Sequence, residues 1–85
     1  MIIDAIFMEL QELGYTVTLC ELDQHGNSRK TIIVKSTAKF LEYHIGIVDH
    51  WIYYWTIDHL GYHARRIDLN DQKFMETLKG LLYVN

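Results

Sequence analysis

The chain has 85 residues, of which 49% are hydrophobic and 22% charged, so we expect one compact domain spanning residues 1–85. Its net charge of −3 argues against direct, sequence-independent binding of nucleic acid, because such binders neutralise phosphates with an excess of Lys and Arg. The single cysteine, Cys20, excludes an internal disulfide and a zinc site built on several thiolates.

The sequence contains no predicted signal for export or membrane insertion. Asp4 follows the apolar start of the chain at once, and no basic residue precedes that start, so no signal peptide is expected. The longest nearly uncharged apolar run covers residues 51–57, which is far short of the ~20 residues of a membrane-spanning helix. We therefore expect a soluble cytoplasmic protein with no membrane partner, a location that a lone cysteine also fits.

The first part of the chain predicts a helix followed by a β-hairpin. Residues 2–13 place apolar side chains at helical spacing, and Gly14 stands where a helix C-cap belongs. From residue 15 to residue 22 the hydrophobic period changes to two, which is typical of a strand. A polar turn at 23–28 then leads into a second strand at 30–35.

The second part predicts two more strands and a closing helix. Residues 40–48 and 51–58 form the strands, joined by a tight connection at Asp49 and His50. Residues 60–67 have no clear period and are either a loop or a short edge strand. Asp68 or Asn70 is the expected N-cap of the last helix. Its apolar stripe consists of Phe74, Met75, Leu78, Leu81 and Leu82.

These elements predict the fold class. Strands joined by short turns are antiparallel, and helices with one apolar stripe each bury that stripe on a sheet. We therefore expect a two-layer α+β domain of order α-β-β-β-β-α, with an antiparallel sheet and two terminal helices on one face.

The face of the sheet opposite the helices is the predicted binding surface. We expect odd-numbered residues of the third and fourth strands to face the core, including Tyr43, Ile45, Trp51, Tyr53 and Trp55. The even-numbered face is then unusually apolar for a surface in contact with water, which indicates a protein partner or a second copy in a homodimer. The alternatives are a bulge that shifts the faces, or coverage of this face by residues 60–67. The predicted partner-binding residues are Phe40, His44, Val48, Ile52, Tyr54, Tyr62, Arg65 and Arg66.

Catalytic and metal-binding patterns are weak in this sequence. There is no phosphate-binding glycine loop and no nucleophile elbow, so we expect no catalytic residue, no cofactor and no enzymatic activity. A metal-dependent enzyme remains an alternative, because four histidines fall close together in sequence, although their expected places in the sheet do not converge. These are His44, His50, His59 and His63.

Two motifs bear on the kind of partner. The adjacent pair Arg65 and Arg66 could contact phosphates or an acidic protein surface, or pair with Asp68 and Asp71. The helix-strands-helix order is shared by double-stranded-RNA-binding domains and by related RNA-cleaving toxins. Those folds begin their last helix with basic residues, whereas residues 68–73 hold two acids and one base, so we do not expect either function.

The opening third resembles small phage-encoded anti-CRISPR proteins. The residues that carry the resemblance are the N-terminal helix, the strand Tyr15-Thr16-Val17-Thr18-Leu19, the polar turn, and the returning Ile32-Ile33-Val34. The turn holds one acid, Asp23, so the dense carboxylates of DNA-mimicking members have no counterpart. The resemblance implies a protein that blocks a CRISPR effector subunit of a bacterial host by covering its surface.

Overall fold

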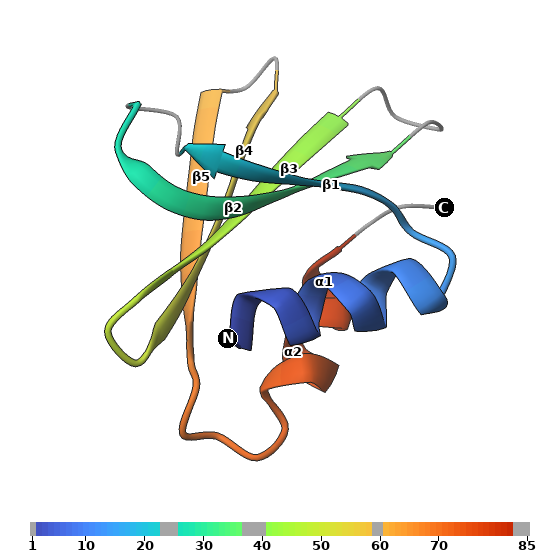
Figure 1. Cartoon of the computed structure of the whole chain (residues 1–85), viewed down its shortest axis with the longest axis vertical. Helices are drawn as coiled ribbons and strands as arrows, with labels where there is room; N and C mark the ends of the chain where they lie inside the picture. The colour runs from blue at the N-terminus through green and yellow to red at the C-terminus, as the bar shows by residue number, and fades with distance from the viewer. Residues whose placement is uncertain (1, 23–25, 37–40, 59–60, 83–85) are drawn as a thin grey trace.

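The computed structural model describes residues 2–22, 26–36, 41–58 and 61–82, and it shows one antiparallel sheet with a helix at each end of the chain (Figure 1). The strands follow one another in the order β1-β2-β3-β4-β5. The elements are α1 (Ile2–Glu12), β1 (Thr16–Leu22), β2 (Ser28–Ser36), β3 (Leu41–Val48), β4 (Trp51–Asp58), β5 (Gly61–Asp68) and α2 (Phe74–Leu81). The predicted α+β class is confirmed. The segment that the sequence leaves undecided between a loop and an edge strand contributes the fifth strand, β5.

Helix α1 ends where the sequence predicts. Gly14 has a φ of 93°, a left-handed conformation that glycine adopts without a steric cost. The amide of Gly14 donates to the carbonyl of Gln11 and that of Tyr15 to the carbonyl of Leu10, each at 3.1 Å. This pair of hydrogen bonds is the Schellman motif, which satisfies the last carbonyls of the helix and turns the chain into β1.

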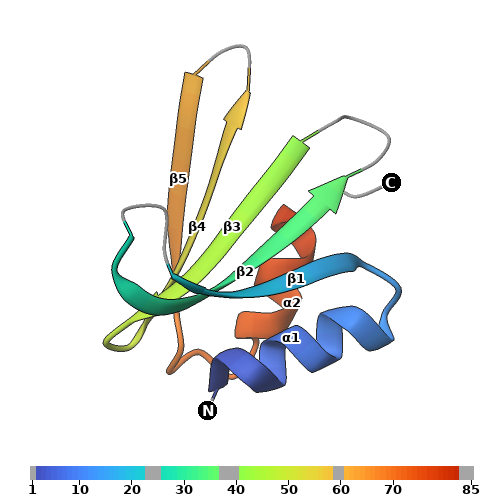
Figure 2. The same ribbon diagram turned by 45° about the horizontal axis from the view of Figure 1, so that its top comes forward.

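Both helices lie on the same side of a strongly twisted sheet, so that β1 and β5 run in clearly different directions (Figure 2). The core lies between the helices and this side of the sheet. Lys30 on β2 also forms an ion pair with Asp4 on α1 at 3.2 Å. The buried core residues are Ile3, Ile6, Leu10, Ile32, Val34, Tyr43, Ile45, Ile52, Tyr54, Ile67, Leu78 and Leu82.

The predicted face of β4 is wrong, whereas that of β3 is confirmed. Tyr43 and Ile45 face the core as expected, but in β4 the core residues are the even-numbered Ile52 and Tyr54. The two-residue turn at Asp49 and His50 is the cause, because it pairs Val48 with Trp51 and hence every odd residue of β3 with an even residue of β4. Directly opposed residues of an antiparallel pair point to the same side of the sheet.

Helix α2 begins later than predicted. Its first residue is Phe74, and its N-cap, Lys73, makes no side-chain capping bond. Asp68 and Asp71 instead accept hydrogen bonds at 2.9 Å from the amides of Asn70 and Lys73, two residues ahead of each. These are Asx turns, which compete with helix formation for the same side chains.

Neither of the two helices in the described residues has the length and apolar character needed to span a bilayer.

Candidate functional site

The side of the sheet that faces away from both helices carries the candidate site, and we call it the outer face. Its central residues on β4 are Trp51, Tyr53 and Trp55, which alternate with the buried Ile52 and Tyr54. Trp51 and Tyr53 are half-buried although no helix covers them. An antiparallel sheet usually presents polar residues on its helix-free side, so three consecutive aromatic side chains there are unusual.

Trp55 is packed across the neighbouring strand β3. A Cβ atom placed on Gly46 would lie 3.3 Å from the indole Cη2 atom, so the ring rests directly on the glycine backbone. The imidazole of His44 stacks on the same indole with ring centroids 5.8 Å apart. Only 9% of Trp55 is exposed, and its buried Nε1–H has no hydrogen-bond partner among the described residues. Packing on Gly46 and His44 therefore holds the Trp55 indole against β3.

The indole of Trp51 contacts the side chains of Arg66 and His50. The Arg66 guanidinium lies 4.2 Å from the centre of the indole, and the His50 ring centroid is 4.7 Å from that of Trp51. A cation–π contact of this kind contributes about 0.5–1 kcal/mol at an exposed position. It also fixes the direction of the Arg66 side chain at the border of the outer face.

The outer face has an apolar centre and a polar rim. The centre contains partly or fully buried residues of β2, β3 and β4, namely Ile33, His44, Gly46, Val48, Trp51, Tyr53 and Trp55. The rim holds the exposed residues Thr16, Thr18, Lys35, Glu42 and Arg66. Glu42 is close to the imidazole of His44, at 3.6 Å between Oε2 and Nε2. Protein interfaces commonly show the same anatomy of an apolar centre within a polar rim.

The structure divides the predicted binding residues between the two sides of the sheet. His44, Val48 and Arg66 lie on the outer face. Ile52 and Tyr54 are buried beneath the helices, so the prediction that they face a partner is wrong. The pairing of β3 with β4 places both side chains on the helix side of the sheet.

The remaining predicted residues lie at the edge of the sheet or outside the described residues. Arg65 is exposed on β5 opposite Tyr54, which places it on the helix side. Tyr62 lies on β5 opposite Ile57. Phe40 falls outside the described residues. The aromatic centre at Trp51, Tyr53 and Trp55 was expected in the core, and the length of the turn before Trp51 is the signal that identifies its true face.

Tyr54 has a structural role. Its hydroxyl donates to the carbonyl of Leu81 at 3.0 Å, and its ring stacks on Tyr43 with centroids 5.4 Å apart. Burial, together with the neighbouring Tyr43, raises the pKa of Tyr54 to about 12, against a smaller lowering effect of Arg65. The neutral hydroxyl therefore joins β4 to the end of α2.

The histidines are spread over different parts of the fold. His44 lies on the outer face, His63 on β5 opposite Thr56 and hence on the helix side, and His50 in the β3–β4 turn. His59 lies outside the described residues. Within the described ranges no group of three or more His, Cys, Asp or Glu side chains is arranged to hold a metal ion.

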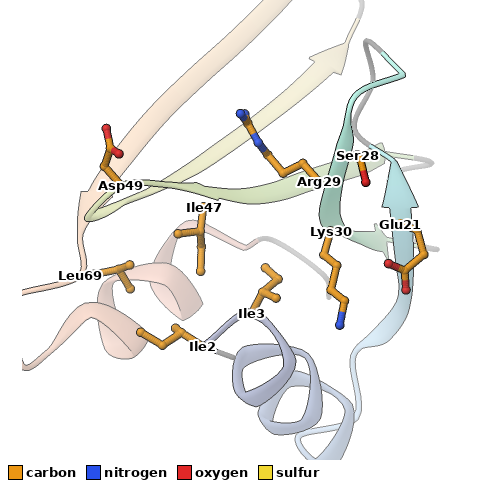
Figure 3. A pocket seen from close by; sticks show the side chains of 9 residues that line it. All are labelled: Ile2, Ile3, Glu21, Ser28, Arg29, Lys30, Ile47, Asp49 and Leu69. Carbon is orange, nitrogen blue, oxygen red and sulfur yellow. The ribbon is translucent and has the colours of Figure 1, made fainter.

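A hollow of about 530 Å³ lies on the other side of the sheet, beside the start of α1 (Figure 3). Lys30 reaches toward α1, whereas Arg29 extends away from it. The hollow has apolar walls and both signs of charge, so its chemistry selects no ligand class. No sequence motif could have identified it, because its residues come from distant segments: Ile2, Ile3, Glu21, Ser28, Arg29, Lys30, Ile47, Asp49 and Leu69.

Comparison with known proteins finds no matching family model, no matching characterised protein and no matching solved structure.

Proposed function

We propose that this chain is a small protein-binding module that acts by covering a surface of its partner with the outer face. The observation that carries the proposal is the aromatic centre at Trp51, Tyr53 and Trp55 on the helix-free side of the sheet. Aromatic side chains and arginine are enriched at protein interfaces, and Arg66 stands beside this centre. In this proposal the protein acts by binding alone.

The first candidate partner is a CRISPR effector subunit of a bacterial host, and the corresponding role is that of a phage-encoded inhibitor. Support for this choice comes from the resemblance of the opening third to small anti-CRISPR proteins. The site of action is then the bacterial cytoplasm. The outer face would block the effector by occupying its surface, because it lacks the concentrated negative charge with which a DNA mimic competes.

The test compares two variants that change the net charge equally. Tyr53→Asp places a carboxylate in the centre of the outer face, and Met8→Asp places one on α1, where Met8 is 58% exposed. The measurement is binding to purified, guide-loaded single-protein nucleases, together with inhibition of their DNA cleavage. We expect Tyr53→Asp to weaken binding by about a hundredfold, typical of a central interface residue. The Met8→Asp control should bind like the unmodified protein.

Two results would contradict the proposal. Equal binding by Tyr53→Asp and the unmodified protein would exclude the outer face as the binding surface. A stable dimer in light scattering that dissociates with Tyr53→Asp, combined with no nuclease binding, would instead identify the outer face as a subunit interface. Far-UV circular dichroism of both variants checks that each retains the fold.

A further inference from the structure

Strand β5 forms a regular open edge of the sheet. Among the described residues it pairs only with β4, and all eight of its residues follow one continuous register from Gly61 to Asp68. The opposite edge, β1, is less regular because its pairing shifts between Cys20 and Leu22. Such irregularities hinder the pairing of a further strand, so β5 is the edge better suited to accept one.

Strand β5 carries one arginine on each side of the sheet. Arg65 projects on the helix side, opposite Tyr54, and Arg66 on the outer side, opposite Tyr53. Both arginines are exposed, and neither takes part in an ion pair among the described residues. Asp68, at the end of the strand and on the same side as Arg66, accepts a hydrogen bond from the amide of Asn70, which orients its carboxylate toward the following turn.

The two arginines favour one kind of incoming strand over another. Two copies of β5 side by side would bring arginine side chains together, and like charges on adjacent strands are destabilising. An incoming strand with carboxylates would pair with them instead, through charge-assisted hydrogen bonds. Arg66 is already positioned by its contact with Trp51, so less side-chain freedom is lost when a carboxylate binds it.

We propose that β5 is the docking edge for an extended acidic segment of a partner protein, which adds to the sheet as a further antiparallel or parallel strand. Main-chain hydrogen bonds to β5 provide affinity, and adjacent carboxylates that reach Arg65 and Arg66 on opposite sides provide selectivity. This inference rests on the proposed function as a protein-binding module, and it adds the chemistry and the shape of the partner segment. An aromatic and basic surface also suits single-stranded nucleic acid, which the test includes as a competing ligand.

The probe is a short threonine-rich peptide with two adjacent glutamates at its centre, and its control carries glutamines in their place. Titration is followed by the amide NMR signals of the uniformly labelled protein. We expect shifts that begin in β5, slower exchange of its outward-facing amides, and binding about tenfold weaker for the glutamine peptide. Arg65→Glu should weaken binding of the glutamate peptide by about the same factor.

Arg29→Glu is the matched control, because Arg29 is also exposed but lies on β2, and the change in net charge is the same. It should bind the glutamate peptide as the unmodified protein does. Equal binding of both peptides, no shifts in β5 at any peptide concentration, or tighter binding of a thymidine oligonucleotide would each overturn the inference. Retention of nuclease binding by Arg65→Glu, with its loss in Tyr53→Asp, would overturn strand docking and leave the proposed function standing.

Discussion

Two adjacent tyrosines on β4 have different roles because strand residues alternate between the faces of a sheet. Tyr53 is half-buried on the outer face, whereas Tyr54 is 7% exposed and lies beneath the helices. The Tyr54 hydroxyl needs a partner in that setting and finds one in the carbonyl of Leu81. A single position in the chain therefore separates a surface aromatic residue from one that stabilises the core.

The raised pKa of Tyr54 predicts a loss of stability in alkali. Its pKa of about 12 in the folded protein exceeds the ordinary value of 10 that it has when unfolded. The associated stability is therefore fully present below pH 10 and is lost as the pH rises from 10 to about 12. We expect this tyrosine to account for a decrease of order 2 kcal/mol in the free energy of unfolding.

Urea unfolding of the unmodified protein and of Tyr54→Phe at neutral and alkaline pH measures this contribution. The variant should be less stable by about 1 kcal/mol at neutral pH, because the Leu81 carbonyl loses its donor. It should also lose less stability than the unmodified protein as the pH rises. An identical alkaline loss in both proteins would show that the titrating group is elsewhere.

At the scale of elements, the helix, the hairpins and the antiparallel pairing could be predicted from hydrophobic periodicity and turn chemistry. The faces of β4 could not be predicted from its own composition, because both of its sides are aromatic or aliphatic. Only the pairing of β4 with β3 decides which side of β4 faces the core, because the turn at Asp49 and His50 places odd residues of β3 opposite even residues of β4. Applied to the sequence, this rule would have placed Tyr53 on the outer face.

Strand β5 and the start of α2 were harder to predict for a physical reason. At an edge, basic and small side chains occupy both faces of the strand, so β5 has no hydrophobic period to detect. Asp68 and Asp71 form turns through their own side chains, although the same residue type also caps helices. Local sequence does not decide between these two uses.

The contact between β3 and β4 at Gly46 gives a prediction for packing. The Trp55 indole would lie 3.3 Å from a Cβ atom at this position, and a branched side chain would need still more room. We expect Gly46→Val to lower the free energy of unfolding by about 1–3 kcal/mol, as overpacked sites do. The measurement is urea unfolding followed by tryptophan fluorescence, with Thr18→Val on the exposed part of β1 as the control. Equal stability of Gly46→Val and the control would show that Trp55 is free to move aside.

At the scale of the whole molecule, both faces of one sheet are apolar but only one has helices to cover it. A chain of 85 residues buries a modest share of its surface, and its core lies on the helix side of the sheet. Burial in this core therefore does not explain the apolar side chains of the outer face. The protein-binding proposal accounts for the aromatic centre, and the strand-docking proposal for the basic edge beside it. Both depend on the division of β4 into an inner and an outer side.

The measurement that tests this division most directly is the free energy of unfolding of Tyr53→Asp and Tyr54→Asp, two neighbouring positions with the same substitution. Tyr54→Asp should lose more than about 4 kcal/mol, because it buries an unpaired carboxylate beneath the helices. Tyr53→Asp should lose less than about 2 kcal/mol, since its carboxylate can reach water. The reverse order of stability, or equal losses in both variants, would contradict the assignment of Tyr53 to the outer face.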